Sequence, residues 1–250
     1  MKKKEYFSAG ALLDISNVPA IVAVVGCGGK TSFIDSLAYE FRHKKVLITP
    51  TTKIIPMIGP EIIMKKNLAE CESHQSAYGI QCLGIYNEAN GKLEAIPPGL
   101  LAEIVPQYDL VLLEADGSRS LPCKGWRPNE PVVPAFCTHT VGIVTLKALG
   151  KAADERHVLN LKEFLRLTGL SDGSVIHSKA LFDMVCAKDG MFRCAAGRPC
   201  VFVNQAEDEQ SADEAVSWLK KWPVEIQNKF YILAYGSAKA NLWKGLNNEK

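Results

Sequence analysis

The sequence lacks several features that would place a protein in a specialised class. No run of apolar residues approaches the length of about 20 that a helix needs to cross a bilayer. The first 20 residues begin with lysines, but their apolar part contains Asp14, so they form no clean signal-peptide core. The sequence also lacks a large excess of positive charge, because its net charge is only +2. Nucleic-acid-binding domains are usually strongly basic. We therefore expect a cytoplasmic protein that binds neither membranes nor nucleic acid.

Cysteine spacing typical of zinc sites is absent as well. The sequence has eight cysteines and no C-x-x-C pair, which is the usual sign of a structural zinc site. The nearest groupings are Cys71 with His74, and the trio Cys186, Cys194 and Cys200. We expect free thiols, as is usual for intracellular proteins.

Apolar runs alternate with helical patterns along the chain. Residues 20–26 form a β-branched run without a polar face, which is typical of a strand buried on both sides of a parallel sheet. Residues 30–44 follow with apolar side chains at helical spacing, and residues 45–50 form the next strand, which completes a βαβ unit. Further strands are predicted at 110–113, 139–146, 199–208 and 229–237, a hairpin at 81–96 around Asn90-Gly91, and helices at 97–107, 160–170 and 178–185.

This alternation predicts one α/β domain over residues 1–250, with a three-layer, doubly wound and mostly parallel sheet and a small hairpin insertion. Residues 54–80 show no clear pattern. In such a sheet, ligands bind at the carboxyl ends of the strands. The chemically suggestive residues of this chain all follow predicted strands.

The segment "GCGGKTS" (26–32) joins the first predicted strand to the first helix. Its glycines allow backbone N–H groups to approach an anion at the start of a helix, and its lysine can reach terminal phosphates. The early glycine of the usual phosphate-binding loop is missing, because Val24 stands at that position, so we expect a tighter P-loop. The alternative is a glycine-rich turn with a solvated lysine. The nucleotide site is expected to comprise Gly26, Gly28, Gly29, Lys30, Thr31 and Ser32, with Thr31 as a Mg²⁺ ligand.

Two acids follow the strand at 110–113. Glu114 and Asp116 point the same way if the strand continues, and Mg²⁺ prefers carboxylate oxygens. We expect one of them to hold the metal and the other to orient a water, so that Lys30, Glu114 and Asp116 form the catalytic group. The alternative is an acidic turn. Arg119 is either a phosphate-stabilising residue or an ordinary surface arginine.

Two further strand ends carry candidate residues. Thr51, Thr52 and Lys53 follow the second strand, where they would contact phosphate or a second substrate, unless they form an exposed helix cap. Asn204 begins an imperfect version of the N-K-x-D motif that recognises the base in GTP-binding proteins, with Gln205 for lysine and Glu207 for aspartate. Alternatively, Asn204 caps a turn.

Four segments together resemble the YqeC family, whose members are described as accessory factors for selenium-dependent molybdenum hydroxylases. They are "VVGCGGKTSFIDSLA", "VLITPTTKI", "LLEADGSRSLPCKGWRPNEPVVP" and "FVNQAED", in that order. The family versions read close to VGAGGKTT, VLVTTTTKI, LVEADGSRGRPLKAPAEHEPVIP and NKVD. This chain departs at Pro50, at 124–126 where K-A-P is usual, and in the last motif.

The resemblance implies a P-loop NTPase-like protein that uses Mg²⁺ and ATP or GTP in the maturation of a molybdenum hydroxylase. Its partners would then be a nucleotide and that enzyme or its cofactor. The resemblance also places Lys124, Arg127 and Glu130 on a functional surface, unless the prolines around them only fix a loop.

Two other functions fit the same residues. The loop would hold the pyrophosphate of a molybdopterin dinucleotide without hydrolysis, with Cys27 and Cys123 as candidates for handling sulfur or selenium. Alternatively, the protein would be a small-molecule kinase or an ATP-dependent ligase with its acceptor loop at 124–131.

Overall fold

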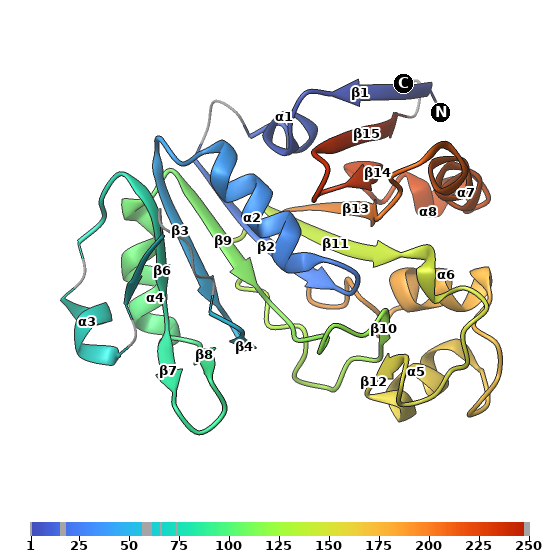
Figure 1. Cartoon of the computed structure of the whole chain (residues 1–250), viewed down its shortest axis with the longest axis horizontal. Coiled ribbons are helices and arrows are strands. Elements are labelled where there is room, and N and C mark those ends of the chain that lie inside the picture. Colours follow the sequence, from blue (N-terminus) through green and yellow to red (C-terminus); the bar gives the residue numbers. More distant parts are fainter. Residues whose placement is uncertain (1, 16–18, 57–61, 66, 74, 248–250) are drawn as a thin grey trace.

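A large, mostly parallel sheet forms the centre of the protein (Figure 1). The computed structural model describes residues 2–15, 19–56, 62–65, 67–73 and 75–247. All strands from β14 to β5, in the order given below, run parallel to one another. At the other end of the sheet, β15 pairs antiparallel with β14, and β1 pairs antiparallel with β15. Within the described residues the order is β1 (Lys2–Tyr6), β15 (Leu242–Asn247), β14 (Ile232–Ser237), β13 (Arg198–Asn204), β11 (His139–Thr145), β2 (Ala20–Gly26), β9 (Leu110–Glu114), β3 (Lys45–Pro50), β6 (Gly79–Leu83) and β5 (Ile62–Lys65).

Helices and two small sheets surround this sheet. The helices are α1 (Ala9–Leu13), α2 (Lys30–Glu40), α3 (Leu68–Glu72), α4 (Pro98–Ile104), α5 (Leu161–Thr168), α6 (Ser178–Cys186), α7 (Glu209–Lys220) and α8 (Val224–Gln227), with 3-10 turns at Val105–Gln107 and Leu146–Ala148. The small sheets are β10 (Cys123–Lys124) with β12 (Val158–Leu159), and β4 (Lys53–Ile54) with β8 (Lys92–Glu94) and β7 (Ile85–Asn87). No helix in the described part of the chain has the length and apolar character needed to cross a membrane.

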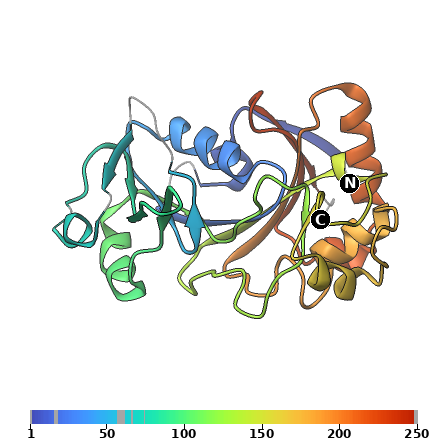
Figure 2. The same cartoon turned by 60° about the horizontal axis from the view of Figure 1, so that its bottom comes forward.

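Each face of the sheet packs against its own hydrophobic core. Alternate residues of β2 divide between them, as expected of a strand buried on both sides: Val22 and Val24 pack with α1 and α2, and Ala23 and Val25 with residues of α4 to α7. Figure 2 shows α2 on one side of the sheet, and α5 to α7 on the other. The mixed α/β fold with a large, mostly parallel sheet is thus confirmed.

The predicted hairpin at 81–96 is wrong in its first half. Residues 81–83 belong to β6, which pairs in parallel with β3 in the main sheet. The hairpin contains only β7 and β8, with Gly91 in the left-handed region of the turn between them. Ile80, Cys82 and Leu83 are buried, so this run is a sheet strand that happens to precede a hairpin.

The remaining differences lie in short or edge elements. The predicted helix at 30–44 ends at Glu40, and the basic residues after it form a turn. The segment 54–80, which showed no pattern, contributes β5, α3 and the start of β6. The predicted strand at 229–237 begins at Ile232, and it is followed by β15, which the sequence pattern did not indicate.

Candidate functional site

The glycine loop lies at the carboxyl end of β2, next to β11, and it contacts the last residues of β11 and β13. Gly26, Gly28 and Gly29 all have φ between 93° and 116°, a conformation that side chains other than glycine rarely adopt. A Cβ on Gly26 would lie 2.3 Å from the carbonyl oxygen of Ile143, and one on Gly28 would lie 2.6 Å from the Cγ2 of Thr145. The tight loop is therefore fixed by close contacts with the neighbouring strand.

Backbone donors gather where this loop enters α2. Among the described residues, no acceptor receives a hydrogen bond from the N–H groups of Gly28, Gly29, Lys30 or Thr31. These groups lie at the positive end of the helix dipole. The loop therefore presents several unpaired donors to an anion, as a phosphate-binding loop requires.

Lys30 lies under this loop and is buried. Its Nζ donates to the carbonyl oxygen of Gly26 at 2.8 Å, and it lies 3.3 Å from Asp116 Oδ1 and 3.7 Å from Glu114 Oε1. Burial by itself would lower the pKa of Lys30, but the charges of Asp116 and Glu114 outweigh burial and raise it. Lys30 is therefore a charged ammonium, and the structure brings together the three residues predicted to be catalytic.

Asp116 is fully buried and holds the loop from below. Its carboxylate accepts hydrogen bonds from the N–H of Gly26 at 3.1 Å and from Trp126 Nε1 at 2.7 Å. The ammonium of Lys124 lies 3.5 Å from its Oδ2. Protein donors, among them Lys30, thus surround both oxygens of Asp116. Asp116 therefore has a structural role in holding the loop and Lys30, besides the predicted metal contact.

Glu114 is the more accessible acid of the two. It is 8% exposed, and burial raises the pKa of its carboxyl group, although the charge of Lys30 and the nearby side chain of Thr31 oppose the shift. Thr31 itself is exposed in the first turn of α2, and Ser32 is half-buried. A hydroxyl and a carboxylate therefore adjoin each other at the mouth of the loop, which fits the hard oxygen ligands that Mg²⁺ prefers.

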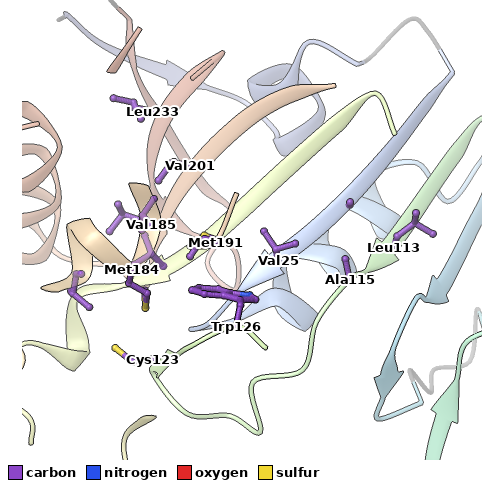
Figure 3. Packing of buried hydrophobic residues seen from close by; sticks show 14 of the residues in the cluster. Val25, Leu113, Ala115, Cys123, Trp126, Met184, Val185, Met191, Val201 and Leu233 are labelled. Atoms are coloured by element: carbon purple, nitrogen blue, oxygen red, sulfur yellow. The ribbon is translucent and has the colours of Figure 1, made fainter. Parts of the chain in front are cut away.

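Trp126 and Lys124 contact the carboxylate of Asp116 from the side of the buried core. Figure 3 shows Trp126 in the buried cluster near Val25 of β2 and Ala115. Lys124 is fully buried, and its Nζ donates to Glu130 at 3.1 Å and to the carbonyl oxygen of Gly117 at 2.8 Å. Lys124 and Glu130, which were expected on a functional surface, thus form a structural ion pair, whereas Arg127 and Arg119 are exposed.

Of the residues after β3, Thr51 lies next to the site and Lys53 lies away from it. The Thr51 hydroxyl donates to the carbonyl oxygen of Val132 at 2.6 Å, and the Thr51 N–H donates to that of Glu114, so Thr51 adjoins the site. Lys53 belongs to β4 and pairs with Glu94 at 2.8 Å, away from the loop. The buried hydroxyl of Thr52 has no hydrogen-bond partner among the described residues. The helix-cap alternative is wrong, because a strand follows at Lys53–Ile54.

Asn204 connects the glycine loop to the last two parallel strands. Its Nδ2 donates to the carbonyl oxygen of Gly28 at 2.8 Å, and its Oδ1 accepts from the N–H of Ala238 at 2.9 Å. Glu207 Oε1 accepts from the hydroxyl of Ser237 at 3.1 Å. Sequence reasoning did not identify Ser237 and Ala238; the available signal was the small-residue segment "GSAK" at the end of the last parallel strand.

The cysteines are free thiols, as predicted. Cys27 and Cys123 lie close to the site but are buried, and burial raises the pKa of both, that of Cys27 to about 12. A reactive thiol requires a lowered pKa, so their environment disfavours a role in handling sulfur or selenium. His74 lies outside the described residues, and among those described no group of three or more His, Cys, Asp or Glu residues is arranged for a metal ion.

Gly29 offers a direct test of this geometry. A Cβ there would lie 2.3 Å from Asn204 Nδ2, and its φ is 116°. We expect Gly29→Ala to lower the free energy of unfolding by about 1–3 kcal/mol, measured by urea denaturation. Gly117→Ala is the matched control, since no described residue other than its chain neighbours has an atom within 4 Å of its Cβ position. In a Gly29→Ala/Asn204→Ala double variant the losses of the two single variants should not add, because the clash between the new methyl group and the Asn204 amide is gone. Equal losses of stability for Gly29→Ala and Gly117→Ala would contradict the geometry.

Comparisons with known proteins find a family model and a relative that match this chain. The family model described as YqeC protein matches residues 22–162, a span that includes the glycine loop and both acids. A relative named Uncharacterized protein YqeC, from Escherichia coli (strain K12), is 27% identical over 218 residues, which cover 83% of this chain and 85% of that protein. No solved structure matches the chain.

Proposed function

The chain belongs to the YqeC family, and from this premise we propose that its glycine loop binds the triphosphate of ATP or GTP together with Mg²⁺. One observation carries the proposal: the N–H groups from Gly28 to Thr31 donate to no described acceptor, and the buried ammonium of Lys30 contacts the same loop at Gly26. Backbone donors at a helix start, combined with a lysine, suit the oxygens of a phosphate chain. The P-loop NTPase-like character of the fold is part of this proposal.

Glu114 and Asp116 have different roles in the proposed nucleotide site. Thr31 and Glu114 would hold the Mg²⁺, which neutralises phosphate charge when it is bound. Asp116 would keep Lys30 and the loop in place, since its oxygens already accept protein donors. Hydrolysis or phosphoryl transfer would then depend mainly on positioning and charge neutralisation, with Glu114 as the acid that orients the attacking group.

The test is titration of the purified protein with ATP and with GTP, each in the presence and in the absence of Mg²⁺. We expect saturable binding that weakens when the metal is removed, because the phosphate charge is then less well neutralised. Release of inorganic phosphate, measured in the same samples, separates a hydrolase from a protein that only binds. Absence of binding for both nucleotides would contradict the proposal.

We further propose that nucleotide turnover serves the maturation of a selenium-dependent molybdenum hydroxylase, with that enzyme or its cofactor as a partner. The ground for this role is the resemblance of the four sequence segments to the YqeC family, whose members are described as accessory factors for such hydroxylases. A strain that lacks the protein should make the hydroxylase polypeptide in an inactive form. Restored activity with the wild-type gene but not with a Lys30→Met gene would tie the role to the loop; full hydroxylase activity in the deletion strain would contradict it.

A further inference from the structure

We propose that the nucleotide site selects guanine over adenine through the carboxylate of Glu207, an inference that rests on the proposed nucleotide binding. The residues that carry it are Asn204, the last residue of β13, with Glu207 after it, and Ser237, the last residue of β14, with Ala238 after it. Asn204 contacts the glycine loop and is hydrogen-bonded to Ala238 of the second segment, although 33 positions separate Asn204 from Ser237 in the sequence.

Asn204 sets the position of this group relative to the phosphates. The residue is 5% exposed, and its side chain connects the carbonyl oxygen of Gly28 to the N–H of Ala238. The absence of a Cβ on Gly29 leaves the room for that amide. A nucleoside extends from its phosphates by a single ribose, so the groups that Asn204 fixes next to the loop are the ones that its base would meet.

The Glu207 carboxylate is oriented for a ligand. The Ser237 hydroxyl donates to Oε1 at 3.1 Å, and the same hydroxyl accepts from the N–H of Ala240 at 3.2 Å. The turn after β14 therefore holds one oxygen of the carboxylate. Glu207 itself is exposed, and no hydrogen bond or ion pair to its Oε2 occurs among the described residues. The second oxygen is thus available to a bound molecule.

An ionised carboxylate accepts hydrogen bonds and donates none. The Watson–Crick edge of guanine presents two neighbouring donors, N1–H and the 2-amino group, which match it. Adenine presents a lone pair at N1 and has no amino group at C2, so it would meet the same carboxylate with repulsion. In the turn, the N–H of Lys239 donates to no described acceptor, which leaves a donor that suits the O6 of guanine and opposes the 6-amino group of adenine.

The chemistry predicts a change of base preference rather than a mere loss of binding. In Glu207→Gln the side chain becomes an amide, which both donates and accepts. Xanthine carries N1–H and a keto oxygen at C2. The amide oxygen of glutamine can accept from N1–H, and its amide N–H can donate to the keto oxygen, so xanthine pairs with the amide as guanine pairs with the carboxylate. The variant should therefore bind XTP better than GTP. Glu207 is exposed, so the protein should fold without change.

The experiment measures Mg²⁺-dependent affinities of GTP, ATP and XTP for the wild-type chain, for Glu207→Gln and for Glu209→Gln, an exposed acid two residues further along. We expect the wild type and Glu209→Gln to bind GTP about 10- to 100-fold more tightly than ATP, as is typical of one bidentate base contact. Glu207→Gln should lose that preference and favour XTP.

Each contrary result has a distinct meaning. Equal affinities for GTP and ATP in the wild type, or tighter binding of ATP, would overturn the guanine inference and leave the proposed function intact. A GTP preference that persists in Glu207→Gln would also overturn it. Failure of the wild type to bind any of the three nucleotides would overturn the proposed function, and the inference with it.

Discussion

Replacement of Lys30 by methionine is expected to weaken Mg²⁺-dependent nucleotide binding about 100-fold and to abolish turnover. The ammonium is the only charge that the glycine loop itself contributes, and a charge-assisted contact is worth about 1.5–3 kcal/mol, or roughly 10- to 150-fold in affinity. Methionine retains most of the buried aliphatic packing. The Asp116 carboxylate would keep Lys124, Trp126 and the N–H of Gly26 as partners, so the chain should still fold.

The matched control for this variant is Lys220→Met, which removes an exposed lysine from the end of α7. It should bind nucleotide like the wild type, as determined by calorimetric titration of both variants. Circular dichroism and thermal unfolding would show whether Lys30→Met is folded. A folded Lys30→Met protein with wild-type affinity would show that the loop does not hold phosphate.

The glycine loop could be located from the sequence because its neighbours have strong local patterns. The run at 20–26 has no polar face, so it indicates a strand covered on both sides, and it is the buried strand β2. The apolar residues after Lys30 recur at helical spacing and form α2. A short loop between two such elements leaves little freedom in where the glycines and the lysine lie.

Elements towards the ends of the sheet could not be predicted in the same way. β15 lies between β1 and β14, and its six residues combine a buried tryptophan, Trp243, with Lys244 and a central glycine, Gly245. Such a pattern is compatible with strand or loop. β6 was assigned to a hairpin because its apolar run directly precedes one, and only pairing with the distant β3 shows otherwise.

The inner support of the candidate site also depends on distant pairing. Nothing near Lys124 or Trp126 in the sequence indicates that both would be buried against Asp116. A lysine in a proline-rich segment is usually exposed, and only the return of this segment below the glycine loop brings it to the carboxylate. The contact of Asn204 with Gly28 spans 176 positions in the same way. Motif spacing could identify the residues but not their partners.

Asp116→Ala is expected to cost about 3–5 kcal/mol of the free energy of unfolding, which is a large part of the usual 5–15 kcal/mol. The substitution would leave the N–H of Gly26 and the indole N–H of Trp126 without their acceptor in a buried region, and each such group costs about 1–3 kcal/mol. It would also remove a negative charge that lies near two buried ammonium groups, those of Lys30 and Lys124.

Guanidinium chloride denaturation would measure this loss, with Asp213→Ala as the matched control. Asp213 pairs with Lys3 on the surface, where both side chains are more than half exposed, so its loss should cost less than about 1 kcal/mol. Asp116→Asn should fall between the two, because the amide oxygen still accepts from Trp126 but carries no charge for the lysines. A cost below about 1 kcal/mol for Asp116→Ala would mean that the contacts of the loop with β11 and Asn204 hold it without Asp116. In that case Asp116 would be free to contact the metal, as the sequence first predicted.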